Sequence, residues 1–263
     1  MKVVIFCGGY GMRIRANDSL VPKPMFTIGS RPVLWHIMRY YSYFGFNDFV
    51  LCLGFGAEVI KEYFLTYRET VSNDFVLEGP DRSIALMNAD TSDWRITFAD
   101  TGADSSIGER LRRARKYLDG DEVFLAAYGD VVTDAPMDQI VDEFRATKAV
   151  GSLLAVPPPD SFHVIDIGDD SLIRGVEAAS HMDLRINGGY FVLRQGIFEY
   201  LNEGDDLVGD ALPRVARAGK FRAVRHDGFW APMDTLKERA QLEILHARGG
   251  APWEVWSRGE HRR

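Results

Sequence analysis

The segment Lys2-Val-Val-Ile-Phe-Cys7 is followed at once by Gly8-Gly9-Tyr10-Gly11. A short unbroken apolar run with several β-branched residues is typical of a strand buried on both faces of a sheet. The glycines that end the run permit a tight turn and let backbone amides approach a ligand closely. These two features together predict an α/β protein whose first strand lies inside a parallel sheet.

Strand-like and helix-like patterns alternate from this point to residue 156. The predicted strands cover 48–53, 75–77, 96–98, 122–127 and 151–156, and the predicted helices cover 33–41, 57–67, 107–117 and 137–147. Such an alternation indicates a mostly parallel, doubly wound, Rossmann-like sheet with helices on both faces.

The run Pro157-Pro158-Pro159 marks a change of pattern. We expect short strands after it, at 164–167, 173–176 and 189–193, in a smaller and more antiparallel lobe. Helices are predicted at 208–218 and 235–247. The chain is therefore interpreted as a single domain of residues 1–263, with a core of 1–156, a lobe of 157–230, and a closing helix and tail of 231–263.

Composition excludes several classes of function. The net charge of -7 disfavours nucleic acid as a partner, because phosphate backbones demand basic patches. Cys7 and Cys52 lie in apolar runs and are expected to be buried, reduced thiols, and no Cys/His group has zinc spacing. No secretory signal is visible, and nothing approaches a membrane span of roughly 20 apolar residues. A cytoplasmic location is expected.

Two elements near the N-terminus have the chemistry to hold phosphates. The loop Gly8-Gly9-Tyr10-Gly11-Met12-Arg13 pairs close backbone approach with a basic side chain, although a simple tight turn explains the glycines equally well. It has neither the dinucleotide G-x-G-x-x-G spacing nor the Walker G-K-[ST] ending. Lys23 lies between Pro22 and Pro24, which restrict the backbone and present its ammonium at a fixed position.

Two aspartates are candidate metal ligands. Asp130 follows a predicted buried strand, and ligands of α/β folds bind at the carboxyl ends of strands. Asp234 immediately precedes the last predicted helix, where a plain helix N-cap is the alternative reading. If the two carboxylates converge, they can hold Mg²⁺ against triphosphate oxygens.

The chain resembles the sugar-phosphate nucleotidyltransferases and, among them, the glucose-1-phosphate cytidylyltransferases. The resemblance covers nearly the whole chain and rests on many short matches. They are Gly8–Arg13, Lys23-Pro24-Met25, Arg31–Met38, Lys61–Phe64, Asp100-Thr101-Gly102, Gly108–Leu111, Tyr128-Gly129-Asp130, Ile186–Gly189, Gly228-Phe229-Trp230, Pro232–Leu236 and Ala251-Pro252-Trp253.

This resemblance implies roles for individual residues. Gly8, Gly9, Gly11 and Arg13 would hold the triphosphate, Lys23 would lie between the reacting phosphates, and Asp130 and Asp234 would bind Mg²⁺. Arg110 would face the nucleotide, and Tyr128, Glu177 and Asn187 would meet the sugar. His36, on an apolar helix face, is interpreted as a packing residue. The partners implied are CTP and a sugar 1-phosphate, and a homo-oligomer is expected.

Three positions depart from the family pattern. Ala178 stands where the family has the lysine that contacts the sugar phosphate, His163 replaces a glycine, and Met12 replaces a threonine. Either another cation replaces the missing lysine, with Arg174, Arg185 and His163 as candidates, or the acceptor differs from glucose 1-phosphate. Our hypothesis is a smaller or differently shaped acceptor. Uridine and thymidine triphosphates remain alternatives to CTP.

Other functions are weighed against this one. A non-catalytic homologue that binds a nucleotide or nucleotide sugar would explain Ala178, and a transferase acting on a phosphonate or alcohol phosphate would explain an altered acceptor side. A nicotinamide-dependent oxidoreductase is disfavoured by the glycine spacing and by the Pro-Lys-Pro element.

Overall fold

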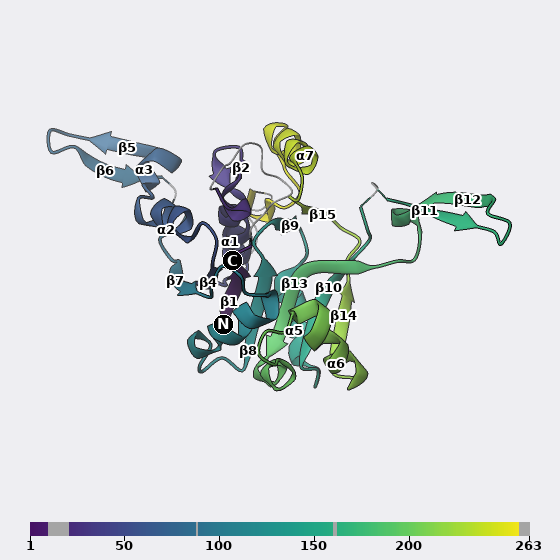
Figure 1. Ribbon diagram of the computed structural model, residues 1–263. Helices are drawn as coiled ribbons and strands as arrows, with labels where there is room; N and C mark the ends of the chain where they lie inside the picture. The colour runs from purple at the N-terminus through teal and green to yellow at the C-terminus, as the bar shows by residue number, and fades with distance from the viewer. Residues whose placement is uncertain (10–20, 88, 160–161, 258–263) are drawn as a thin grey trace.

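The computed structural model describes residues 1–9, 21–87, 89–159 and 162–257 (Figure 1). Its centre is a seven-stranded mixed sheet in the order β14-β10-β13-β8-β1-β4-β7. The strands are β1 (Lys2–Phe6), β4 (Asp48–Leu53), β7 (Arg95–Asp100), β8 (Val123–Tyr128), β10 (Gly151–Val156), β13 (Ile186–Arg194) and β14 (Phe221–Arg225).

The sheet is parallel except at one strand. β1 pairs in parallel with both β4 and β8, β4 with β7, and β10 with β14. Only β13 runs antiparallel to its neighbours, β8 and β10. The predicted doubly wound α/β fold with a mixed sheet is therefore confirmed.

Each face of the sheet carries its own apolar core because successive side chains of a strand point to opposite faces. Val3 and Ile5 of β1 pack with the helices of one layer, and Val4 and Phe6 with those of the other. The first layer contains α1 (Val33–Tyr43), α2 (Ala57–Leu65), α5 (Met137–Arg145) and α7 (Leu236–Ala247). The second contains α4 (Ile107–Ala114), η3 (Arg115–Tyr117), η5 (Gln195–Tyr200), η6 (Leu207–Ala211) and α6 (Leu212–Arg217).

Two hairpins project from the body of the molecule on opposite sides (Figure 1). One pairs β5 (Phe75–Glu78) with β6 (Ser83–Leu86) beyond the short α3 (Glu69–Ser72), and the other pairs β11 (His163–Ile167) with β12 (Ile173–Ala178). All residues of β5, β6 and β11 are exposed. The predicted strand at 75–77 thus exists, but it lies outside the main sheet.

The smaller lobe contains less of the chain than we expected. Within residues 157–230, only the β11–β12 hairpin and the turn η4 (Ala179–His181) leave the body, whereas β13 and β14 join the main sheet. The run from Gly189 to Leu193 is buried on both sides, which is the burial of a central strand rather than of a two-stranded lobe.

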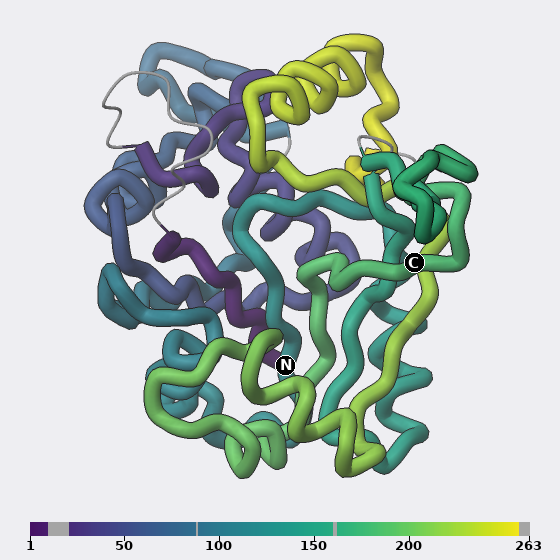
Figure 2. Tube along the Cα trace, turned by 45° about the vertical axis from the view of Figure 1, so that its right-hand side comes forward, coloured from purple at the N-terminus to yellow at the C-terminus, as the bar shows by residue number. Residues whose placement is uncertain are grey.

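Short elements complete the chain. They are η2 (Lys23–Met25), β2 (Thr27–Ile28), β3 (Arg31–Pro32), β9 (Val131–Thr133), β15 (Trp230–Pro232) and η7 (Val255–Ser257). Viewed from a second direction, α7 and the segment after it close over the end of the sheet near the N-terminal third of the chain (Figure 2). Cys7 and Cys52 are buried free thiols, as predicted. None of the described helices is both long and apolar enough to cross a membrane.

Candidate active site

The ends of two neighbouring strands bring the glycine loop and Asp130 together. β1 and β8 pair in register up to Phe6 and Tyr128, so Gly8 and Asp130 emerge side by side. The amide of Gly129 donates to the Phe6 carbonyl across 3.2 Å, and a Cβ at Gly129 would lie only 2.9 Å from that oxygen. Glycine is required here because any side chain would push the two strand ends apart.

Packing of a proline places Lys23 beside this point. Pro22 is extended, and Lys23 opens the 3₁₀ turn η2, in which Pro24 is buried. The ring of Pro24 lies against Gly129, 3.1 Å from where a Cβ would be. The Pro-Lys-Pro sequence therefore holds the lysine against the carboxyl end of β8, and its side chain is only 13 % exposed.

A short two-stranded ribbon brings Asp234 to the same place. β15 pairs with β9, which follows Asp130 directly, and the Met233 amide donates to the Asp130 carbonyl across 2.8 Å. Thr235 is the N-cap of α7, and Glu238 completes a capping box with it. Because Thr235 occupies the N-cap, the N-cap reading of Asp234 is wrong. The Asp234 backbone amide donates to Glu238 Oε2 across 2.8 Å.

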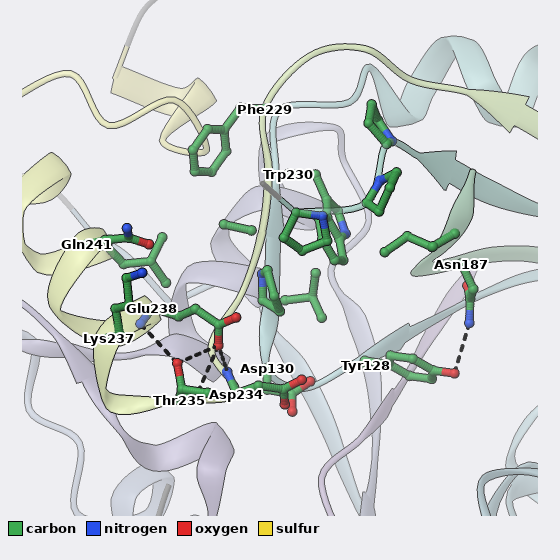
Figure 3. A pocket seen from close by; sticks show the side chains of 18 of the residues that line it. Tyr128, Asp130, Asn187, Phe229, Trp230, Asp234, Thr235, Lys237, Glu238 and Gln241 are labelled. Atoms are coloured by element: carbon green, nitrogen blue, oxygen red, sulfur yellow. Dashed lines mark hydrogen bonds between the residues drawn. The ribbon is translucent and has the colours of Figure 1, made fainter. Parts of the chain in front are cut away.

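Asp130 and Asp234 lie side by side in the cavity (Figure 3), and Lys23 bonds to both of them. The Lys23 ammonium donates to Asp130 Oδ2 across 3.3 Å and to Asp234 Oδ1. Burial raises the pKa of Asp130, the lysine opposes that effect, and repulsion from Asp234 adds to it. Although burial lowers the pKa of Lys23, the two carboxylates raise it above its ordinary value. The lysine therefore stays charged between two acids.

Arg110 has a different place from the one we expected. It is 2 % exposed and does not line the cavity. Its guanidinium donates to the carbonyls of Gly8, Leu53 and Gly102 across 2.9, 3.2 and 2.8 Å. These carbonyls follow or end three adjacent parallel strands, so Arg110 ties the start of the glycine loop to the sheet edge. We expected Arg110 to face the nucleotide, but the structure gives its side chain this supporting role instead.

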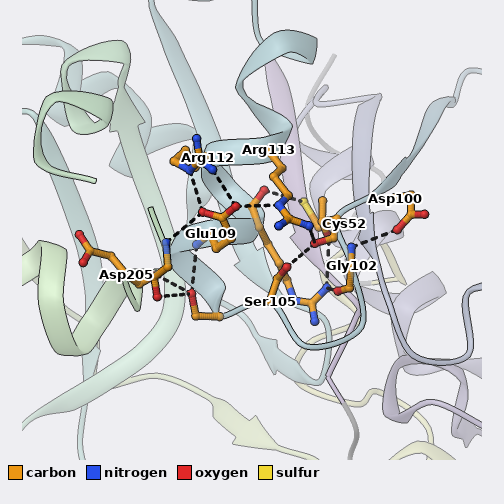
Figure 4. A network of polar contacts seen from close by, with 12 residues as sticks. Cys52, Asp100, Gly102, Ser105, Glu109, Arg112, Arg113 and Asp205 are labelled. Carbon is orange, nitrogen blue, oxygen red and sulfur yellow. Dashed lines mark hydrogen bonds and ion pairs between the residues drawn. The ribbon is translucent and has the colours of Figure 1, made fainter. Parts of the chain in front are cut away.

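The preceding residue holds the helix that carries Arg110. Glu109 accepts hydrogen bonds from Arg112, Arg113 and the Gly204 amide, and Ser106 caps the helix start (Figure 4). The bond from Arg112 is the main reason that the pKa of Glu109 falls to about 2, although burial opposes it.

The far part of the cavity is lined by rings and amides. Asn187 Nδ2 donates to the Tyr128 hydroxyl across 3.0 Å, and burial raises the pKa of that hydroxyl to about 12 (Figure 3). The Trp230 indole donates to the Gly188 carbonyl across 2.8 Å, which fixes its ring in the wall. The cavity, with a volume of about 1600 Å³, thus offers flat apolar faces and fixed hydrogen-bonding groups beyond Lys23.

The predicted site residues fall into three groups. Those that line the cavity are Gly9, Lys23, Tyr128, Asp130, Asn187 and Asp234, and Gly8 lies directly beside them. Those that the structure does not bring to the cavity are Arg110, His163, Glu177 and Arg185. Gly11 and Arg13, with Met12, lie outside the described residues, so their roles stay predictions.

The sequence did not lead us to several residues that form the wall of the cavity. Phe162, His181, Phe229, Trp230, Lys237, Glu238 and Gln241 also line the cavity. The pattern Thr235-x-x-Glu238 is a capping-box signature and would have identified Glu238 as the residue that positions Asp234. Phe229 and Trp230 lie in a motif that the chain shares with the family, although no role was assigned to them. No local signal marks the others, because they come together only through α7 and the hairpin base.

Comparison with known proteins identifies the class. The family model described as nucleotidyl transferase matches residues 2–238, and the chain belongs to that family. It is 37 % identical over 257 residues to the glucose-1-phosphate cytidylyltransferase of Salmonella typhimurium, covering 97 % of this chain and 100 % of the relative. It is 34 % identical over 258 residues to the probable glucose-1-phosphate cytidylyltransferase of Bacillus subtilis, with 97 % and 100 % coverage.

Solved structures share the fold at lower identity. A putative glucose-1-phosphate thymidylyltransferase from Bacillus anthracis superimposes with a TM-score of 0.69 and 17 % identity, covering 96 % of this chain and 98 % of the other. HddC from Yersinia pseudotuberculosis superimposes with a TM-score of 0.64 and 18 % identity, covering 93 % and 99 %.

Proposed function

We propose that this protein transfers the nucleotidyl group of an NTP to a sugar 1-phosphate and releases pyrophosphate. The NTP that we propose is CTP. The observation that carries the proposal is the meeting of Lys23, Asp130 and Asp234 in a cavity that Gly9, beyond the end of β1, also lines. The two cytidylyltransferase relatives that align over almost their whole length support the choice of base and of acceptor class.

The reaction needs charge neutralisation rather than a covalent intermediate. A phosphate oxygen of the acceptor attacks the α-phosphorus in line, an oxygen–phosphorus bond forms, and the bond to the leaving pyrophosphate breaks. Lys23 would lie between the two reacting phosphates, and the two carboxylates beside it raise its pKa above the ordinary value, so it brings a positive charge to the site. Preorganised charges of this kind lower the barrier because the protein does not have to reorganise during the reaction.

The two aspartates fit Mg²⁺. Proteins usually bind Mg²⁺ through one or two carboxylates, and substrate phosphates and water complete its shell. Asp130 and Asp234 supply two carboxylates that converge on one cation-binding point. Within the described ranges, no cluster of three or more acidic, histidine or cysteine side chains could hold a metal ion by itself. When bound, Mg²⁺ would neutralise and orient the triphosphate.

Pyrophosphate release tests the proposal. CTP, UTP, dTTP, ATP and GTP are each combined with hexose, pentose and amino-sugar 1-phosphates, together with a phosphonate and an alcohol phosphate, in the presence of Mg²⁺. We expect release with CTP and one sugar 1-phosphate. Turnover only with a phosphonate or alcohol phosphate would support the alternative transferase. No turnover, together with nucleotide binding, would support the non-catalytic homologue and contradict our proposal.

We also propose that the protein is a homo-oligomer. The two hairpins that leave the body carry exposed apolar side chains, including Leu77, Ile84 and Val176. Apolar patches of this kind on a projecting element favour contact with a partner. A cytoplasmic location is proposed as well, because both substrates are phosphorylated metabolites of that compartment.

A further inference from the structure

The acceptor part of the cavity needs a positive charge other than Lys23. A sugar 1-phosphate carries a phosphate group close to dianionic at neutral pH, and it must approach a triphosphate that is also negative. Tyr128, Asn187 and Trp230 supply a hydroxyl, an amide and a ring, all neutral. Lys23 is already shared between Asp130 and Asp234. The question is which side chain meets the acceptor phosphate.

None of the three expected cations is in position. Arg174 pairs with Asp170 across 2.7 Å near the exposed turn of the β11–β12 hairpin. Arg185 pairs with Asp227 across 2.5 Å and does not line the cavity. His163 pairs with Ala178 in the hairpin and is exposed, also away from the cavity wall.

Within the described chain, the basic side chains that line the cavity are Lys23, His181 and Lys237. Lys237 lies in the first turn of α7, on the Asp234 side of the cavity and across from Asn187 (Figure 3). His181 ends the η4 turn, shortly before Ile186 and Asn187, which also line the cavity at the start of β13. Like His163, it is exposed. Among the described basic side chains of the cavity, His181 is therefore the one that lies nearest to Asn187 along the chain.

A short turn joins position 178 to position 181. β12 ends at Ala178, and the next three residues form the 3₁₀ turn η4, of which His181 is the last. Ala178 is the extended N-cap of this turn, so positions 178 and 181 lie at its two ends. The turn is fixed by the Ala179 amide, which donates to the Phe162 carbonyl across 2.9 Å, and Ala179 itself is buried.

We propose that His181 binds the acceptor phosphate, in place of a lysine at position 178. An imidazole N–H donates to a phosphate oxygen that does not attack, and so holds the acceptor in line with the α-phosphorus. This inference rests on the proposed function, and it makes the chain selective for acceptors whose phosphate reaches the η4 turn. An imidazole is shorter than a lysine side chain, so the acceptor must sit closer to the hairpin base.

The test removes the basic side chain at position 181, places one at position 178, and measures the steady-state kinetics of each variant. His181→Ala should raise the KM for the acceptor about tenfold or more and leave the KM for CTP within about twofold. Adding Ala178→Lys to His181→Ala should bring the acceptor KM back to within about threefold of wild type. His163→Ala is the matched control, an exposed histidine of the same hairpin, and should change neither constant.

The outcomes separate the two proposals. Wild-type turnover combined with an unchanged acceptor KM in His181→Ala would overturn this inference and leave the proposed function standing. An equal rise in both KM values, or no recovery with Ala178→Lys, would make His181 a structural residue and also overturn it. Absence of wild-type turnover with every substrate pair would remove the proposed function and this inference with it.

Discussion

At the scale of single residues, Lys23 is the group on which the candidate chemistry depends. Its ammonium separates two carboxylates, and burial with mutual repulsion would otherwise raise the pKa of Asp130 further. The same ammonium is available to the phosphates because the lysine lines the cavity. It therefore stabilises the site when empty and the transition state when substrates are bound.

Replacing Lys23 by methionine should lower kcat by about 10² to 10³-fold, the range typical of removing one electrostatic stabiliser. The KM for CTP should change much less, because other groups of the loop also hold the triphosphate. Steady-state kinetics with saturating acceptor measure both constants. Lys237→Met, which removes a lysine from another wall of the same cavity, is the control. Comparable kcat losses in the two variants would contradict a specific role for Lys23.

At the scale of elements, the first turn of α7 determines where Asp234 lies. Glu238 accepts hydrogen bonds from the backbone amides of Asp234 and Thr235, and the Thr235 hydroxyl accepts one from the Glu238 amide. The capping box is therefore part of the candidate metal site and not only a helix start.

Two substitutions should separate stability from site geometry in this turn. Thr235→Ala should lower the free energy of unfolding by about 1 kcal/mol, the usual cost of a lost N-cap. Glu238→Ala should in addition lower kcat and raise the Mg²⁺ concentration needed for half-maximal rate, because Asp234 loses its backbone partner. Urea unfolding and Mg²⁺ titrations measure the two effects. Glu58→Ala, an exposed acid in the first turn of α2, should change neither. An unaffected Mg²⁺ dependence in Glu238→Ala would argue against this account.

The helix α1 and the C-terminal segment are joined through a buried histidine. His36 Nε2 bonds to the Ile28 carbonyl across 3.1 Å, and its Nδ1 accepts from the Trp253 indole across 3.3 Å. Burial lowers the pKa of His36 from 6.5 to about 4. The expectation of a packing role agrees with this burial, although the ring is also hydrogen-bonded.

Because of His36, the free energy of unfolding should fall as the pH is lowered from 6.5 to about 4. Because the pKa is lower in the folded state, the unfolded chain takes up the proton first, so the stabilisation is complete above pH 6.5 and is lost as the pH falls to about 4. The loss should be on the order of 3 kcal/mol. Glu109, whose pKa falls from 4.5 to about 2, acts in a separate window below pH 4.5.

Urea unfolding at several pH values between 4 and 7.5 measures the slope. His36→Gln should be less stable than wild type at pH 7.5 but should lose much of the decline toward pH 4. His163→Gln, at an exposed position, should keep the wild-type slope. An unchanged slope in His36→Gln would show that other groups cause the decline.

At the scale of the whole molecule, the two projecting hairpins carry apolar side chains that would stay in contact with water in a monomer. The side chains of Phe75, Leu77 and Ile84 are 40 %, 49 % and 53 % exposed, and Ile173 and Val176 on the other hairpin are 61 % and 60 % exposed. Two-stranded hairpins are only marginally stable when isolated in water. Contact with a partner subunit would stabilise both.

Wild-type protein should therefore sediment as an oligomer at micromolar concentration. Leu77→Lys with Ile84→Lys should shift the distribution to smaller species, because charge on the apolar hairpin opposes its burial. Analytical ultracentrifugation measures the masses. Lys61→Glu, which exchanges one charge for another on the exposed face of α2, should leave the assembly intact. A wild-type monomer would contradict the proposed assembly.

The sequence by itself determined the class of fold and the key polar residues. Buried apolar runs at β1, β4 and β8 are strong signals because strands covered on both faces need to be apolar throughout. The glycine loop, Lys23, Asp130 and Asp234 stand out because each is framed by residues that restrict the backbone or end a strand. The same reasoning led directly to the family, which the comparisons then confirmed.

Only the tertiary structure decided which of these residues meet and which do not. The position of β13 inside the sheet, the burial of Arg110 and the distance of His163, Glu177 and Arg185 from the cavity depend on contacts between segments far apart in the chain. A local sequence pattern indicates that a residue is buried, but it does not show which other residues pack against it. For that reason Lys23, Asp130 and Asp234, framed by strand ends and prolines, were predictable, whereas the places of Arg110, Glu177 and Arg185 were not.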